Sequence, residues 1–307
     1  GGNIRVGSSE LFVTEACEYT NSFLHFFPKI AVILNIDADH LDFFKDLDDI
    51  RHSFRRFAQL LPADGTLIIN KEIEHLEEIT DGLSCRVVTF GLDSSADYYA
   101  DQISHDETGN AAFHVVSHGK DTGRVELSVK GDHNICNALS VIAVADLLDI
   151  SRDDVCSGLQ SFTGTDRRFE HKGDWNGVTV IDDYAHHPTE IKATLKAADV
   201  YPHREIWCVF QPHTYTRTKA LFPEFVEALS HTDHVVLADI YAARETDTLG
   251  ISSQMLAEEL KKKGCDAYYL PSFEAIEDFL KTHCQKGDVL ITMGAGNVVN
   301  IGEALLK

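Results

Sequence analysis

Residues 178–306 alternate between short apolar runs and longer amphipathic stretches, and this alternation constrains the fold more than any other feature of the chain. The apolar runs have the length of β-strands, at 178–182, 205–210, 234–240, 267–270 and 289–293. The stretches with helical spacing are 188–200, 219–230, 252–263, 272–283 and 299–306. Strands and helices that alternate in this way predict an α/β, doubly wound, mostly parallel sheet with helices on both faces.

The first half of the chain has a different pattern and is expected to form a separate domain. Residues 29–36 are nearly all apolar, as in a strand that is buried on both faces. Asp46 is placed to cap a helix at 46–61, whose apolar residues are three and four positions apart. The other expected elements are strands at 10–16 and 66–70, antiparallel hairpins between 86 and 130, a buried helix at 137–150 and a short helix at 151–163. A polar, glycine-containing segment then predicts a boundary between domains at 1–163 and 164–307.

Charge and composition exclude several classes of protein. The chain of 307 residues has 27 Lys and Arg against 49 Asp and Glu, a formal net charge of −22, which argues against nucleic-acid partners and against anionic membranes. No apolar run approaches the roughly 18 residues of a membrane-spanning helix, so no membrane insertion is expected. The seven Cys are scattered and include no C-x-x-C pair, which favours free thiols in a reducing cytoplasm over disulfides or structural zinc.

Acidic residues and a histidine follow the apolar run at 29–36. Asp37, Asp39, His40 and Asp42 crowd this strand end, an arrangement that suits a divalent cation held together with phosphate oxygens. Asp also favours loops on its own account, so the spacing alone leaves turn formation open. Glu15, at the end of another expected strand, is a candidate partner for the cation.

Two asparagines lie at the start of the expected buried helix. Because Asn134 and Asn137 are three positions apart, both amides are able to face one side of the first turn and to bind the edge of a base. Helix capping by Asp132 or Asn134 is the alternative interpretation.

The densest titratable groups follow strands of the second domain. Asp182 ends the run at 178–182, and Asp183, Tyr184, His186 and His187 follow it directly. Ligands of open α/β sheets bind at the carboxyl ends of strands, so this polarity indicates a site.

A second cluster follows the run at 205–210. There Arg217 and Lys219 are placed to hold a carboxylate or phosphate, unless they only form a solvated first helical turn. Gly294 and Gly296 lack the third glycine of a dinucleotide fingerprint, which leaves close packing of a helix or a phosphate as their simplest role.

Seven motifs occur in the order in which the Mur ligase family has them. They are T-E-A-C-E-Y-T-N-S-F-L, N-I-D-A-D-H-L-D, G-D-H-N-I-C-N-A, D-R-R-F-E, D-D-Y-A-H-H-P-T-E-I, Q-P-H-T-Y-T-R-T and G-A-G-N. N-x-x-x-D-H and H-N-x-x-N-A are shared across that family, whereas D-D-Y-A-H-H-P-T-E and Q-P-H-x-Y-T-R-T point to its alanine-adding branch. The chain therefore resembles the Mur ligase family along its whole length, with a partial central ATP-binding domain followed by a Rossmann-like ligase domain.

The resemblance implies an activity and a set of site residues. It implies transfer of the γ-phosphoryl group of ATP to the carboxylate of UDP-N-acetylmuramate and attack of L-alanine on the acyl phosphate, in peptidoglycan precursor synthesis. ATP and Mg²⁺ are the expected cofactors. The matched residues are Glu15 and His40 for magnesium, Asn134 and Asn137 for adenine, Arg168 for a nucleotide phosphate, Asp183 for ribose, and Tyr184, His186, His213 and Arg217 around alanine and the acyl group.

Three of these residues receive a catalytic role in this interpretation. A guanidinium suits a carboxylate, so Arg217 is assigned the carboxylate of alanine. His186 or His213 is expected to take the proton of the attacking amine, and the sequence does not choose between them.

The sequence also departs from the family pattern. No G-x-x-x-x-G-K-[ST] loop and no uridine-nucleotide domain are recognisable, so the chain is expected to be a fragment that starts inside the central ATPase domain and is inactive alone. Thr214 stands where many relatives have Arg. Two alternatives stay open, namely another ATP-dependent acid–amino-acid ligase, such as a folylpolyglutamate relative, and a non-catalytic binding module.

Overall fold

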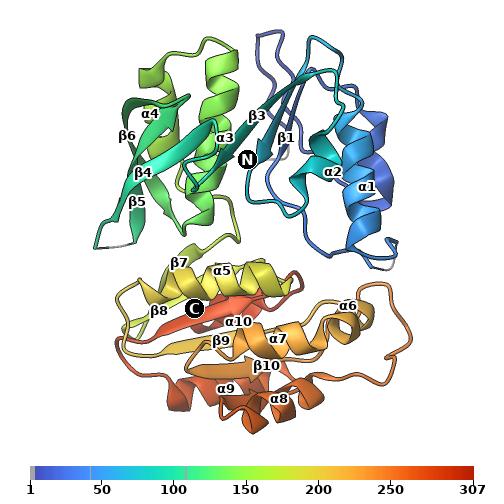
Figure 1. The fold of residues 1–307 in the computed structure, drawn as a ribbon. Helices are drawn as coiled ribbons and strands as arrows, with labels where there is room; N and C mark the ends of the chain where they lie inside the picture. Colours follow the sequence, from blue (N-terminus) through green and yellow to red (C-terminus); the bar gives the residue numbers. More distant parts are fainter. Residues whose placement is uncertain (1–3, 42, 108) are drawn as a thin grey trace.

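The computed structural model describes residues 4–41, 43–107 and 109–307 and contains two six-stranded sheets. The first sheet lies with its helices in the upper half of Figure 1, in blue to green, and the second lies below it, in yellow to red. Among the described residues, no helix combines the length and the apolar character that crossing a bilayer requires. All seven Cys are free, as the scattered spacing predicted.

The first sheet has the strand order β1-β2-β3-β4-β5-β6. Neighbours from β1 to β4 are parallel, and β4, β5 and β6 form an antiparallel meander. The strands are β1 Ile30–Ile33, β2 Thr66–Asn70, β3 Arg86–Gly91, β4 Tyr98–His105, β5 Asn110–Ser117 and β6 Lys120–Lys130. The helices are η1 Tyr19–His25, α1 Leu47–Ala58, α2 Leu76–Thr80, α3 His133–Leu147 and α4 Arg152–Ser161.

Burial explains why these helices cover both faces of the sheet. Leu67 and Ile69 of β2 pack against Phe57 of α1, whereas Ile68 between them faces the opposite core, which contains Leu139 of α3. Alternate strand residues point to opposite faces, so a strand that is apolar throughout needs both layers. Asp46 caps α1 as expected, because its carboxylate accepts the Asp49 amide at 3.0 Å.

The prediction of a strand at residues 10–16 is wrong. This segment has no regular secondary structure, and its apolar side chains Leu11, Phe12 and Val13 are exposed. A strand requires a neighbour that takes up its backbone hydrogen bonds, and in the described residues β1 pairs with β2 alone. An apolar run therefore does not suffice without a place in the sheet.

The second sheet has the order β11-β10-β9-β12-β8-β7 and is parallel except at one edge. Its strands are β7 Glu170–Trp175, β8 Val178–Asp183, β9 Ile206–Phe210, β10 His234–Leu237, β11 Asp266–Tyr269 and β12 Val289–Met293. The helices are α5 Pro188–Asp199, α6 Tyr215–Ala220, α7 Phe222–Leu229, α8 Ser253–Lys262, α9 Phe273–His283 and α10 Val299–Leu305. The expected α/β, mostly parallel fold is confirmed, and the antiparallel edge strand β7 was not predicted.

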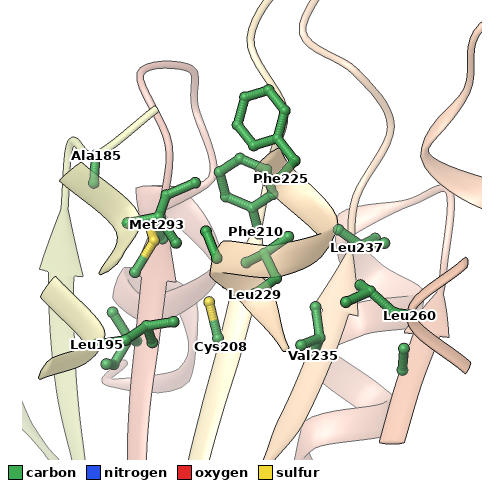
Figure 2. Close-up of a cluster of buried hydrophobic side chains, with 14 of the residues drawn as sticks. Ala185, Leu195, Cys208, Phe210, Phe225, Leu229, Val235, Leu237, Leu260 and Met293 are labelled. Atoms are coloured by element: carbon green, nitrogen blue, oxygen red, sulfur yellow. The ribbon is translucent and has the colours of Figure 1, made fainter. Parts of the chain in front are cut away.

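Two layers of helices cover the second sheet. Figure 2 shows one core, in which Leu195 of α5 and Phe225 and Leu229 of α7 lie against Cys208 and Phe210 of β9. The helices α9 and α10 bury the other face. The single helix expected at 219–230 is two helices, because α6 ends at Ala220 and α7 begins at Phe222, directly before Pro223.

The register of the central strands aligns three strand ends. Met293 of β12 pairs with Asp183 of β8 on one side and with Phe210 of β9 on the other. The segments that begin at Tyr184, Gln211 and Gly294 therefore leave the sheet at one edge. This edge carries most of the polar residues that the sequence singled out.

Candidate active site

The loop after β1 contacts the loops of the second sheet. Arg217 donates from Nη2 to Oδ1 of Asp39 at 2.7 Å and from Nε to the same oxygen at 3.0 Å. The Nε2 atom of His187 lies 2.9 Å from the carbonyl oxygen of Ala38, and the hydroxyl of Thr189 donates to the carboxylate of Asp37. These contacts bring together residues that are about half a chain length apart in sequence.

Helix termini position the second-sheet side of this contact. His187 caps α5, since its Nδ1 accepts the amide of Thr189 at 3.3 Å and Glu190 accepts the His187 amide at 3.2 Å. With Nδ1 an acceptor, the proton of a neutral His187 lies on Nε2, which donates to Ala38. Thr214, with φ at +65°, caps the start of α6 by accepting the amide of Arg217 at 3.4 Å.

The contact between the two domains separates two pockets. One pocket, with a volume of about 230 Å³, is lined by Tyr19, residues 38–41, His213, Thr214, Thr216, Arg217, Ala220, Leu221, Arg244 and Glu245. The other, of about 220 Å³, is lined by Glu18, residues 35–37, Asp39, Ile50, Phe54, His187, Thr189 and Glu190. Asp39 contributes to the walls of both pockets, so its carboxylate lies between them.

Histidine 213 is held in its neutral form beside the cation of Arg217. Burial, with the positive charge of Arg217 adding to it, lowers the pKa of His213 to about 4. Nη1 of Arg217 lies 3.2 Å from Nδ1 of His213, and a guanidinium only donates, so Nδ1 accepts. The proton of neutral His213 is thereby assigned to Nε2.

Histidine 186 has the opposite tautomer. Its Nδ1 lies 3.0 Å from the carbonyl oxygen of Tyr184 and 3.3 Å from the carboxylate of Glu190, so Nδ1 carries the proton. Burial lowers the pKa of His186 despite the charge of Glu190, which leaves Nε2 as an unprotonated acceptor. The rings of His186 and His213 are 5.8 Å apart, so the structure brings the two predicted histidines together.

Glu18, and not the predicted cation ligand Glu15, is an acidic neighbour of His40 in the structure. Glu15 is exposed, and it is Glu18, three residues later in the same motif, whose carboxylate lies 3.4 Å from Nε2 of His40. The His40 ring stacks on Tyr19 at 4.4 Å, which fixes its orientation. In the sequence, only its place in that motif marks Glu18 as a candidate. The direction of its side chain depends on the 3₁₀ turn that begins at Tyr19, which the sequence does not predict.

The described residues supply part of a cation site. Among them, no group of three His, Cys, Asp or Glu side chains converges on a common point, and Asp42 lies outside the described residues. Mg²⁺ usually keeps several waters and phosphate oxygens and takes one or two protein ligands. The pair of Glu18 and His40 fits that kind of incomplete donor set.

The two asparagines at the start of α3 are joined to each other. The Asn137 amide donates to Oδ1 of Asn134 at 3.1 Å, and the Asn134 amide donates to the carbonyl oxygen of Lys130 at 2.7 Å. Asp132 makes no side-chain cap of α3 and instead accepts from Lys196 of α5 at 2.7 Å. The amides are therefore adjacent and half-buried, as a shared binding edge requires.

The predicted ribose and phosphate contacts have different surroundings. Asp183 is buried, and its carboxylate accepts the amides of Ala185 at 2.7 Å and Phe169 at 2.9 Å, while burial raises its pKa. Arg168 is half-exposed and lies 3.4 Å from Glu190. Arg168 is thus available to a ligand, whereas Asp183 is engaged in shaping the turn.

Sequence reasoning missed Glu245, which organises the start of α6. Its carboxylate accepts the Thr216 amide at 3.1 Å and the Thr216 hydroxyl at 2.5 Å, and it also accepts the Tyr215 amide. A carboxylate at a helix N-terminus is stabilised by the helix dipole. No local motif marks Glu245, because its partners are about 30 residues away.

Comparisons with known proteins place the chain in a family. The family description "Mur ligase middle domain" matches residues 3–145, and "Mur ligase, glutamate ligase domain" matches residues 167–296. The chain is 56% identical over 306 residues to the UDP-N-acetylmuramate–L-alanine ligase of Agathobacter rectalis, a match that covers 100% of this chain and 67% of the relative. It is 50% identical over 307 residues to the ligase of the same name from Caldanaerobacter subterraneus, with the same coverage.

Solved structures agree with this assignment. The UDP-N-acetylmuramate–alanine ligase of Thermotoga maritima matches with a TM-score of 0.75 and 27% identity, over 93% of this chain and 60% of that one. MurF from Acinetobacter baumannii, at 20% identity and a TM-score of 0.73 over 94% of this chain and 60% of its own, shares the fold. The chain therefore belongs to the Mur ligase family of ATP-dependent, C–N bond-forming ligases and contains sequence of both its middle domain and its glutamate ligase domain.

Proposed function

We propose that the protein joins L-alanine to the carboxylate of UDP-N-acetylmuramate in an ATP-dependent step of peptidoglycan precursor synthesis. Relatives that carry this name match the chain along its whole length at 50% identity and above. The chain spans two thirds of those relatives and 60% of the T. maritima structure. The observation that carries the proposal is the ion pair of Asp39 with Arg217, which puts His40, proposed to bind the cation, into the lining of one pocket with His213 and Arg217, proposed to surround alanine.

On the phosphate side, we assign the cation to Glu18 and His40 rather than to Glu15. A carboxylate oxygen of Glu18 and Nε2 of His40 are 3.4 Å apart, close enough to bind the same ion, while Glu15 is exposed. Bound Mg²⁺ would neutralise charge that develops on phosphate oxygens. Asn134 and Asn137 would bind the adenine edge, with Arg168 at a phosphate and Asp183 near the ribose.

On the amino-acid side, Arg217 would hold the carboxylate of alanine. Its guanidinium is mostly buried and already binds one carboxylate, that of Asp39. Alanine must therefore take over donors that Asp39 occupies in this structure. Tyr184, His186 and His213 would form the surroundings of alanine and the acyl group, since the Tyr184 and His186 rings are 5.4 Å apart.

The tautomers of the two histidines divide their roles. Nε2 of His186 is unprotonated, so His186 would take the proton from the attacking amine. Nε2 of His213 carries a proton, so His213 would instead donate a hydrogen bond to an oxygen that gains negative charge.

A substrate screen tests the proposed function. We define a hybrid ligase, in which this chain replaces the part of the A. rectalis relative that it matches. Purified hybrid ligase is supplied with ATP and Mg²⁺, and phosphate release and product mass are measured with UDP-N-acetylmuramate or a folate as the acid and with L-alanine, glycine, D-glutamate or L-glutamate as the amine. The expected result is release that requires both UDP-N-acetylmuramate and L-alanine. Preferential use of a folate and L-glutamate would instead support a folylpolyglutamate-type ligase.

A further inference from the structure

We propose that Arg167 is a positioning residue for the alanine and acyl side of the site, because it fixes the ring of Tyr184 and the turn at Gly294. The inference rests on the proposed function, since the importance of Tyr184 comes from that function. Arg167 lies beside Arg168 in the sequence, yet its contacts face the sheet.

A buried carboxylate anchors the guanidinium. Nε of Arg167 donates to Oδ2 of Asp182 at 2.9 Å, and the hydroxyl of Thr292 donates to the other oxygen at 2.7 Å. The side chains of Asp182 and Thr292 are fully buried and lie opposite each other on β8 and β12. The position of the Arg167 guanidinium is therefore fixed by two buried residues on neighbouring strands of the second sheet.

The same guanidinium binds the turn that follows β12. Nη2 of Arg167 donates to the carbonyl oxygen of Gly294 at 2.7 Å. Gly294 has φ at +145°, and a Cβ atom there would lie 2.6 Å from the carbonyl oxygen of Gln211. The turn thus requires glycine, and its carbonyl is directed at Arg167 instead of toward solvent.

Tyr184 is held by Arg167 in two ways. The Tyr184 amide donates to the carbonyl oxygen of Arg167 at 2.7 Å, and the guanidinium carbon lies 4.8 Å from the centre of the Tyr184 ring. A guanidinium over an aromatic face is attracted by the ring quadrupole. Because the Tyr184 ring is in edge contact with His186, fixing Tyr184 also fixes one wall around the proposed proton acceptor.

These contacts separate the roles of the two adjacent arginines. The Arg167 side chain is 24% exposed and donates to Asp182 and Gly294. The Arg168 side chain is 50% exposed and lies beside Glu190, and its guanidinium carbon is 5.5 Å from the centre of the Tyr184 ring, but it has no hydrogen bond to the sheet or to the Gly294 turn among the described residues. Its greater exposure favours Arg168 as the residue that would bind a nucleotide phosphate. Arg167 acts through Tyr184 and the Gly294 turn, so its removal should affect alanine use rather than ATP use.

A comparison of neighbouring substitutions tests this separation in the hybrid ligase. Arg167→Gln should raise the KM for L-alanine by about tenfold and change the KM for ATP by less than about twofold. The matched control, Arg168→Gln, should raise the KM for ATP more than the KM for L-alanine. Arg167→Lys keeps the charge but loses the planar fork, so it should recover part of the alanine KM.

A paired variant separates positioning from simple structural support. Arg167→Gln alone leaves Asp182 buried without its cation and should lower the melting temperature. Adding Asp182→Asn removes that charge, so the melting temperature should recover while the alanine KM stays raised. An alanine KM that recovers together with the melting temperature would show that Arg167 only supports the fold.

The outcomes also distinguish the inference from the function on which it rests. Alanine-dependent activity in the unsubstituted hybrid ligase, combined with an unchanged alanine KM in Arg167→Gln, would overturn the inference alone. Absence of alanine-dependent activity in the unsubstituted hybrid ligase would overturn the proposed function and this inference with it.

Discussion

Two nitrogen atoms of Arg217 converge on a single carboxylate oxygen of Asp39, at 2.7 and 3.0 Å, and so join the two domains. Burial favours a raised pKa for Asp39, yet the charge of Arg217, followed by that of His40, brings the pKa below its ordinary value. Asp39 is therefore a carboxylate anion that occupies the donors assigned to the carboxylate of alanine. A substrate and a side chain then compete for one guanidinium.

Neutralising Asp39 should strengthen alanine binding. In the hybrid ligase, Asp39→Asn should lower the KM for L-alanine by about fivefold, the effect of removing roughly 1 kcal/mol of competing ion pairing. Initial rates at varied alanine concentration measure this change, with Asp37→Asn as the neighbouring control. A raised alanine KM in Asp39→Asn would mean that Asp39 orients Arg217 instead of competing for it.

Substitution of the two glutamates of one motif should separate the cation ligand from its neighbour. Glu18→Gln should raise the Mg²⁺ concentration for half-maximal rate of the hybrid ligase by about tenfold, because a charged oxygen donor beside His40 is lost. Glu15→Gln should leave that concentration within about twofold of its original value. The opposite ranking would restore Glu15 as the ligand and assign Glu18 a structural role.

The lowered pKa of His213 should make the 307-residue chain less stable in acid. The folded-state pKa of about 4 lies below the unfolded value of about 6.5, so between these values the unfolded chain binds more protons. The contribution of His213 is fully present above pH 6.5 and is lost as the pH falls toward 4. His186, whose pKa is also lowered, contributes in the same direction.

Urea unfolding from pH 7 to 4.5 measures this effect. His213→Gln should flatten the decline of the unfolding free energy over that range, whereas His25→Gln, at an exposed position, should leave it unchanged. An identical decline in the chain and in His213→Gln would show that His213 is not buried as a neutral group.

Local signals explain which parts of the fold the sequence predicts. The helix after Asp46 was predicted from its cap and periodicity, and the strand at Thr66–Asn70 from its apolar run between turn residues. The antiparallel strand β7 escaped prediction because its sequence, E-H-K-G-D-W, is polar and contains Gly173, as befits an edge strand with one neighbour. The prediction of a strand at 10–16 was wrong for the converse reason, since apolar residues without a pairing partner do not form a strand.

For the site, too, local motifs predict some residues and miss the contacts between distant ones. Motifs and strand ends selected His40, His213 and Arg217 as candidates, and all three line one pocket. They could not identify the Asp39–Arg217 pair or the Arg167–Gly294 contact, because these residues are 178 and 127 positions apart and meet only through the folded domains. The sequence also could not show that Glu18 rather than Glu15 lies beside His40, because this depends on the direction of the backbone, which turns at Thr20 and Asn21, two and three residues after Glu18, where φ is positive.

The central claim is that L-alanine binds through its carboxylate to Arg217 at the contact between the domains. The most direct measurement is the KM for L-alanine of the Arg217→Lys hybrid ligase, with the KM for ATP measured alongside. Loss of the planar two-donor contact costs about 1.5–3 kcal/mol, so the alanine KM should rise about ten- to hundredfold while the ATP KM stays within about twofold. A raised ATP KM with an unchanged alanine KM would contradict the account and place Arg217 in the nucleotide site.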